Sequence, residues 1–124
     1  MLNIQKYKNK TIIGLYEKVV LQGNGGIKKE ILARIDTGAT RSSIDVKLAA
    51  SLKLGPVLKT KIVKSAHGTT LRPIVEGTVE VASKKITSHF TIADRSKMKY
   101  RVLIGQDVLK QEEFLIDPLE PKEI

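Results

Sequence analysis

The sequence predicts an all-β domain, in which a closed or sandwiched sheet is accompanied by one or two short helices. About six or seven short segments are rich in β-branched residues or alternate apolar with polar residues, and short turns separate them without a strand–helix–strand rhythm. With 124 residues, of which 41% are hydrophobic, the chain can form one domain with a real core. We therefore expect a single domain over residues 1–124, with a frayed extension at 1–10 and a frayed tail at 119–124.

The first part of the chain predicts a β-hairpin. Residues 11–21 are rich in β-branched residues and form one expected strand, in which Gly14 marks a bulge or bend. Residues 22–26 are a cluster of turn-forming residues. Residues 27–35 alternate between apolar and polar side chains, which is typical of a second strand that pairs with the first.

A short helix comes next in the chain. Asp45 stands at the N-cap position before residues 46–54, and Gly55 followed by Pro56 ends the helix. We favour this capping role for Asp45 over a catalytic one.

The remaining segments predict a long hairpin and three further strands. Residues 57–64 and 71–81 form the hairpin, whose tip lies near His67 and Gly68. The later strands are expected at residues 86–92, 101–105 and 114–116, and one helical turn is expected at residues 106–110.

Asp36 is the candidate catalytic residue. It follows a hydrophobic strand and precedes Thr37 and Gly38, and such a turn holds a carboxylate rigidly within reach of a ligand. We expect Gly38 to turn the backbone where a Cβ would clash, and Thr37 to lock the loop through its hydroxyl. A tripeptide is a weak signal by itself, but a second apolar–apolar–glycine element follows at residues 103–105.

The charge balance favours an anionic partner. There are 22 Lys and Arg against 13 Asp and Glu, which gives a net charge of +9 at pH 7. Nucleic acid is less favoured than acidic peptides, because the basic residues are scattered and only three Tyr, two Phe and no Trp could stack on bases. There is no apolar run of the roughly 20 residues that a membrane span needs, and no signal-peptide pattern, so we expect a cytoplasmic protein without a membrane partner.

In the order of these elements, residues 27–118 resemble the retropepsin-like aspartic proteases. The resemblance rests on Asp-Thr-Gly-Ala at residues 36–39, on the hairpin tip, and on Leu-Ile-Gly-Gln-Asp-Val-Leu at residues 103–109. More closely, the sequence resembles a small prokaryotic family long labelled ATP-dependent zinc protease. The shared patterns are an Arg-Pro pair, an Asp-Arg-x-x-Met segment and a closing Asp-Pro, at residues 72–73, 94–98 and 117–118. The resemblance implies a closed retropepsin-like (acid protease) β-barrel.

This resemblance implies a homodimeric aspartic endopeptidase. Peptide hydrolysis by carboxylates needs two of them that share one proton, so that one polarises the carbonyl while the other activates water. Because the chain has one Asp-Thr-Gly, we expect the second carboxylate to be Asp36 of another copy. The resemblance also implies that Thr37 braces the two loops and that Gly38 lines the cleft. The expected substrate-binding residues are Ala39, His67, Gly68, Arg72 and Arg95.

Two positions depart from the viral retropepsins, which carry an acid directly after Asp-Thr-Gly-Ala and an Arg directly after the second glycine. Thr40 and Gln106 occupy these places here, so that ion pair is absent. Arg41 and Asp107 each follow by one residue, and we expect them to form a replacement ion pair.

The family label does not extend to a zinc site in this chain. The histidines are His67 and His89 only, no cysteine is present, and neither His-Glu-x-x-His nor a P-loop occurs, so we expect no metal and no cofactor.

Arg72 and Arg95 are either partners of Glu76 or Asp94 in structural salt bridges or receptors for a substrate carboxylate, which suits the planar guanidinium. The charge surplus favours acidic, glutamate-rich peptides. The association of relatives with ATP-grasp ligases that add glutamates to proteins points the same way.

Two alternatives stay open at this point. One is an inactive retropepsin-like domain used for dimerisation or peptide binding, because a catalytic fold does not guarantee catalysis. The other, less favoured, is a small basic β-barrel that binds RNA.

Overall fold

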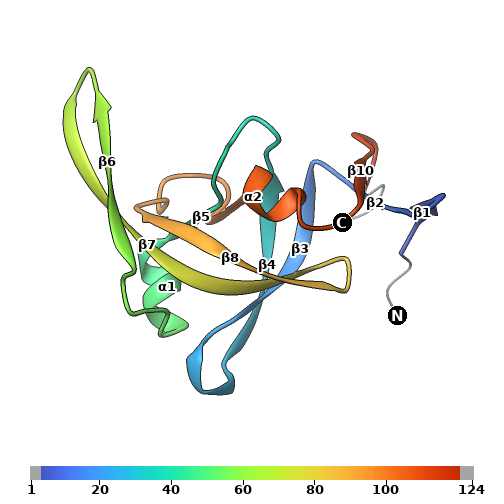
Figure 1. Ribbon diagram of the computed structural model, residues 1–124, viewed down its shortest axis with the longest axis horizontal. Coiled ribbons are helices and arrows are strands. Elements are labelled where there is room, and N and C mark those ends of the chain that lie inside the picture. Colours follow the sequence, from blue (N-terminus) through green and yellow to red (C-terminus); the bar gives the residue numbers. More distant parts are fainter. Residues whose placement is uncertain (1–3, 121–124) are drawn as a thin grey trace.

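The computed structural model describes residues 4–120, and its strands close into a ring (Figure 1). The elements in chain order are β1 (Lys6–Tyr7), β2 (Lys10–Ile13), β3 (Tyr16–Gln22), the 3₁₀ turn η1 (Asn24–Gly26), β4 (Lys28–Ile35), β5 (Ser43–Asp45), α1 (Val46–Ser51), β6 (Lys59–Ser65), β7 (Gly68–Val81), β8 (Lys84–Ala93), β9 (Val102–Ile104), α2 (Gln106–Leu109) and β10 (Phe114–Ile116).

Six of these strands form a barrel. The hydrogen-bonded order is β3-β4-β9-β5-β8-β7, and β3 pairs a second time, with β7, which closes the ring. The alternation along each strand turns one set of side chains inward, and the core is aliphatic apart from Phe90. The expected closed β-barrel with two short helices is confirmed. None of the helices described between residues 4 and 120 is long and apolar enough to span a membrane.

The single strand expected over residues 11–21 is wrong, because the chain bends at Gly14 and Leu15 and forms two strands. The Gly14 N–H donates to Glu17 Oε2 at 3.1 Å, and the Leu15 carbonyl accepts the Ile35 N–H at 2.9 Å. The bend takes β2 out of the barrel and into a small sheet between β1 and β10. The segment expected as an N-terminal extension therefore contains β1 and the first residue of β2. Residues 1–3 and 121–124, where fraying was also expected, lie outside the described residues.

The long hairpin of β6 and β7 is confirmed, and it projects from the barrel (Figure 1). From Ile74 onward, β7 pairs with β8 and is part of the barrel, whereas its first residues pair only with β6. The turn lies between Ser65 and Gly68, and Gly68 has a φ of 120°, which favours glycine. One continuous strand thus connects the barrel to the projecting hairpin.

Asp45 caps α1, as its position in the sequence predicts. Its Oδ2 accepts the N–H groups of Lys47 and Leu48 at 3.1 and 3.4 Å. Its Oδ1 accepts the Arg95 N–H at 2.8 Å, and the residue is 1% exposed. The carboxylate therefore joins the helix to the loop that carries Arg95.

Asp45→Ala should lower the free energy of unfolding by about 1–3 kcal/mol, because it removes a helix cap and leaves three buried or partly buried N–H groups without their acceptor. Urea unfolding measures the loss. Asp45→Asn, which keeps one acceptor oxygen, should recover part of it. The matched control is Asp94→Ala, because within residues 4–120 the exposed Asp94 carboxylate bonds only to Ser96 in its own turn. Equal stability of the two alanine variants would contradict the assignment.

Candidate active site

Asp36 leaves the barrel at the end of β4 and is held from one side only. Its N–H donates to the Ile104 carbonyl at 2.8 Å, and its Oδ1 accepts the Gly38 N–H at 3.0 Å. Within residues 4–120, its Oδ2 has no hydrogen-bond partner, and the side chain is partly exposed. The loop therefore leaves one carboxylate oxygen of Asp36 without a partner among the described residues.

The second apolar–apolar–glycine element supports this loop from below. β4 and β9 are parallel neighbours, with Ile35 opposite Ile104, so the segments that follow these two strands leave the sheet at the same edge. The N–H groups of Gln106 and Asp107 donate to the carbonyls of Ala39 and Thr40 at 2.8 and 3.2 Å. The first turn of α2 thus satisfies backbone groups of the loop that the loop cannot satisfy itself.

The side chain of Gln106 adds a further contact. Its Nε2 donates to the Thr37 carbonyl at 2.8 Å. Between the two strands, Gly105 leaves room for the loop, since a Cβ there would lie 2.8 Å from the Ala39 carbonyl oxygen. The close approach requires a glycine at this position.

The ion pair expected between Arg41 and Asp107 is wrong. Asp107 accepts from Ser42 instead: the Ser42 N–H lies 3.0 and 3.1 Å from Oδ1 and Oδ2, and the Ser42 hydroxyl lies 2.6 Å from Oδ1. Ser42 is fully buried. A serine N–H and hydroxyl satisfy the carboxylate without burying a guanidinium, which would be far more costly to desolvate.

The reasons given above for Thr37 and Gly38 do not hold within one chain. Within the described residues the Thr37 hydroxyl has no hydrogen-bond partner, and it is the Thr37 carbonyl that fixes the loop, through Gln106. Gly38 does not adopt a left-handed conformation, and a Cβ there would lie 3.4 Å from Asp36 Oδ1, an ordinary contact. Both residues are exposed beside Asp36.

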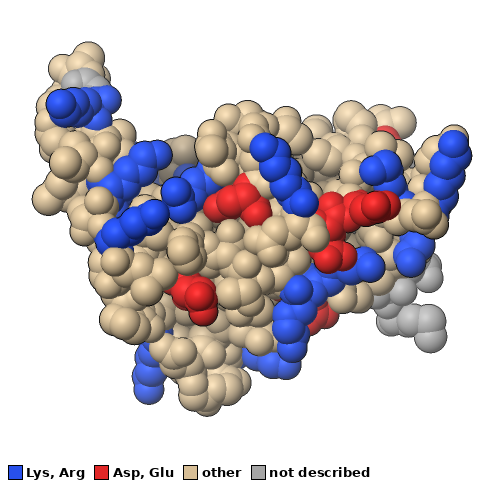
Figure 2. Space-filling view, in the orientation of Figure 1, with Lys and Arg blue, Asp and Glu red and all other residues tan. Residues whose placement is uncertain are grey.

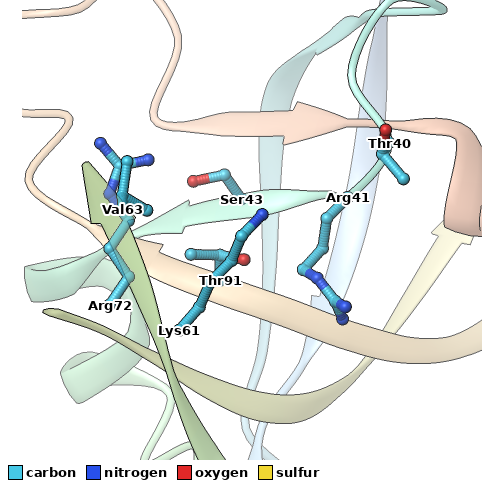
Figure 3. A pocket seen from close by; sticks show the side chains of 7 residues that line it. All are labelled: Thr40, Arg41, Ser43, Lys61, Val63, Arg72 and Thr91. Carbon is cyan, nitrogen blue, oxygen red and sulfur yellow. The ribbon is translucent and has the colours of Figure 1, made fainter. Parts of the chain in front are cut away.

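Three cations gather in a pocket beside the loop (Figure 3). The pocket holds about 220 Å³, and its lining residues are Thr40, Arg41, Ser43, Lys61, Val63, Arg72 and Thr91. Lys61 and Arg72 are directly opposite one another in the β6–β7 register, so their side chains share one face of the hairpin. None of the described residues that line this pocket is acidic, and like charges placed this way repel in the absence of an anion.

Arg95 lies in the same electrostatic neighbourhood. Burial and the charge of Arg72 lower the pKa of Arg95, while Asp36 and Asp45 act in the opposite direction. The Arg95 Nε–H donates to the Tyr100 carbonyl at 3.0 Å. Neither Arg72 nor Arg95 forms the salt bridge with Glu76 or Asp94 that their sequence context allowed, since the ion pair between described residues is that of Lys84 with Glu112.

The structure brings the predicted residues together unequally. Ala39 lies in the Asp36 loop, and Arg72 and Arg95 lie within electrostatic range of each other. His67 and Gly68 form the exposed tip of the hairpin and line neither this pocket nor a second one of about 370 Å³ that Arg72 shares with the end of β8. Sequence reasoning missed Lys61, although counting back from the hairpin tip places it opposite Arg72.

Comparison with known proteins gives a consistent result. A family model described as RimB-like, retropepsin-like aspartic endopeptidase RimB, matches residues 47–122, which is more than half of the chain. The matched range begins after the Asp-Thr-Gly turn. No curated protein matches the sequence significantly.

Two solved structures show the fold. The crystal structure of a protein of unknown function from Legionella pneumophila subsp. pneumophila str. Philadelphia 1 has a TM-score of 0.61 and 20% identity, over 86% of this chain and 92% of that chain. The solution structure of the Simian Foamy Virus (mac) protease has a TM-score of 0.55 and 18% identity, over 76% of this chain and 92% of that chain. The expected retropepsin-like architecture is confirmed.

Gly105→Ala should destabilise the fold by about 1–3 kcal/mol, because the new methyl group would overlap the Ala39 carbonyl and force the two segments apart. Chemical denaturation measures the change. Gly38→Ala is the matched control, and it should leave the free energy of unfolding near that of the wild type. A tolerated Gly105→Ala would show that the loop is not packed against this residue as closely as described.

Proposed function

The chain belongs to the RimB-like family of retropepsin-like aspartic endopeptidases, and from this premise we propose that it is a cytoplasmic, homodimeric peptidase. The reaction is hydrolysis of a peptide bond by water, activated between the Asp36 carboxylates of two copies. The observation that carries the proposal is the carboxylate of Asp36, held by the Gly38 N–H on one oxygen and without a partner within residues 4–120 on the other.

The remaining acids of the region support a second copy as the source of the other carboxylate. Asp45 is committed to the cap of α1, Asp107 to Ser42, and Asp94 to Ser96 in its own turn. Among the described residues of this region, a single chain therefore offers one available catalytic acid, whereas the chemistry needs two at close range. The exposed Thr37 hydroxyl, which lacks a partner within the described chain, suits a contact across a two-fold axis.

The mechanism follows from the pair. Two carboxylates a few ångström apart cannot both ionise, so the dyad holds one proton and titrates as a unit. The ionised Asp36 takes a proton from the water molecule, and the water oxygen attacks the peptide carbon. At the same time the protonated Asp36 donates its proton to the carbonyl oxygen. Collapse of the tetrahedral intermediate breaks the C–N bond: the Asp36 that took the proton from water gives it to the departing amine, and the other Asp36 takes back a proton from a hydroxyl of the intermediate, which leaves the carboxylic acid product and restores the dyad. Because Asp36 Oδ1 already accepts the Gly38 N–H, Oδ2 is the oxygen free to contact water or substrate.

Acidic peptides are the proposed substrate class. Arg41, Lys61 and Arg72 converge on one pocket that has no acidic lining residue, and Arg95 lies near Arg72 and Asp36. Figure 2 shows basic side chains grouped at the foot of the projecting hairpin. A substrate carboxylate would relieve the repulsion among these cations and form charge-assisted hydrogen bonds with the guanidinium groups.

Asp36→Asn should abolish cleavage of a peptide library that includes glutamate-rich sequences, with a loss of at least about 100-fold from acid to neutral pH. The loss follows because an amide cannot share the proton. Analytical ultracentrifugation should show that both the wild type and Asp36→Asn are dimers. Asp94→Asn, the same change at an exposed acid outside the dyad, should stay active.

The possible results separate the hypotheses. Cleavage that survives Asp36→Asn would remove Asp36 from the mechanism. A folded wild-type dimer that binds but never cleaves peptides would favour the inactive binding module instead.

Lys61→Gln and Arg72→Gln should each lower kcat/KM for a glutamate-rich peptide by about 10-fold to 100-fold, since each removes a charge-assisted contact. The same variants should change kcat/KM little for a peptide whose acidic residues are replaced by glutamine. Lys64→Gln is the matched control, because Lys64 lies on the same strand but does not line the pocket. Equal effects on acidic and neutral peptides would contradict recognition of acidic side chains.

A further inference from the structure

We propose that Asp107 is a positioning residue, which acts through Ser42 to hold the Asp36 loop in the geometry that a carboxylate pair requires. This inference rests on the proposed function, because it concerns the alignment of the proposed dyad. Asp107 itself lies one residue into α2 and is bonded to the far end of the loop, not to Asp36.

The loop between Asp36 and Ser42 has little structure of its own. Its internal hydrogen bonds are those of the Gly38 N–H with Asp36 Oδ1 and of the Ala39 N–H with the Asp36 carbonyl, the latter at 3.3 Å. Thr37, Gly38 and Thr40 are exposed, so burial does not fix them. The conformation must therefore be imposed from outside the loop.

Besides the hydrogen bonds that α2 donates to the Thr37, Ala39 and Thr40 carbonyls, two anchors hold the ends of the loop. At the start, the Asp36 N–H donates to Ile104. At the end, Ser42 is bound through its N–H and its hydroxyl to Asp107, and its carbonyl accepts the Thr91 N–H at 3.0 Å. Of these groups, the Asp107 carboxylate is the one side chain that closes the far end.

The direction of the hydrogen bonds requires Asp107 to accept. The Gly105 N–H donates to Ser42 Oγ at 2.9 Å, and Ser42 Oγ in turn donates its one proton to Asp107 Oδ1. Oδ1 also accepts the Val108 N–H at 2.9 Å. A carboxylate satisfies all these donors, and with Ser42 fully buried the charge-assisted bonds are strong. This explains why an acid rather than another small polar residue suits the position.

A displacement of the loop at Ser42 would change the position of the Asp36 carboxylate in the proposed dyad. Two acids that share a proton must approach within hydrogen-bond distance, and an error of about 1 Å at a reacting group can cost about 100-fold in rate. Loss of the far anchor would free the end of the loop at Ser42 from Asp107, while the hydrogen bonds of α2 to the carbonyls of the loop and the pairing of the barrel strands remain. The effect should therefore appear mainly in turnover rather than in substrate binding.

The test compares Asp107→Ala, Asp107→Asn and Ser42→Ala in the full-length dimer, with rates normalised to folded dimer. Asp107→Ala should lower kcat by about 100-fold with KM changed by less than about threefold. Asp107→Asn, which keeps one acceptor oxygen, should restore about 10-fold of the loss. Ser42→Ala/Asp107→Ala should be no worse than Asp107→Ala, because both changes break one linkage. Asp117→Ala, at an acid that bonds to Leu119 in its own turn, is the control and should leave kcat unchanged.

A second readout does not depend on cleavage. NMR titration of ¹³C-labelled aspartate should show the Asp36 pair titrating in two separated steps in the wild type, and the steps should converge in Asp107→Ala. In Asp107→Ala, amide hydrogen exchange at Gly38 and Ala39 should be faster than in the wild type, and the increase should be larger than at core amides.

The outcomes distinguish the two proposals. A wild type that neither cleaves nor shows coupled titration would overturn the proposed dyad, and loop exchange would then still decide whether Asp107 holds the loop. A variant that unfolds more easily but keeps the wild-type kcat, Asp36 titration and loop exchange would overturn the positioning role. If Asp107→Ala does not fold, the same comparison is made with Asp107→Asn and Ser42→Ala.

Discussion

The parallel pairing of β4 with β9 is the constraint on which the rest of this molecule depends. It sends the Asp36 turn and the Gly105 turn off the same edge of the barrel, so that backbone groups of one can satisfy those of the other. A tight loop with exposed side chains would otherwise leave its carbonyl and N–H groups to water and would sample many conformations. The buried contact between Ser42 and Asp107 completes this junction at its far end. The loop of the candidate active site is thus held by hydrogen bonds from a segment about seventy residues away in the chain.

The same topology also places charge beside the carboxylate. β7 belongs to the barrel over its second half and to the projecting hairpin over its first, so Arg72 and its cross-strand neighbour Lys61 are carried over the surface next to Arg41. The pocket formed there holds cations from three separate parts of the chain. Such a concentration of one charge is unfavourable unless a ligand of opposite charge occupies it for part of the time. We regard this as the physical link between the basic composition and the proposed acidic substrate.

Several features could be predicted because their causes are local. Alternation of apolar residues predicts strands, the carboxylate before a helical run predicts the cap at Asp45, and a glycine between two expected strands predicts the hairpin tip at Gly68. Others could not, because they depend on contacts between distant segments. The break at Gly14 reflects the pairing of β2 with β10, and the partner of Asp107 is decided by which side chain faces inward once β9 lies beside β4 and β5. A shift of one residue along the chain would place Arg41 instead of Ser42 beside Asp107, and only the fold determines that register.

The sequence by itself therefore determined the class of fold, the order of its elements, the family resemblance and the identity of the single acid in a glycine turn, since each follows from residue types and their local spacing. The tertiary structure decided which groups hold that acid, which cations lie near it, and that the loop is held through the Thr37 carbonyl and the Gly38 N–H rather than through the Thr37 hydroxyl or a left-handed Gly38. These depend on distances between segments that the chain brings together only by closing the barrel.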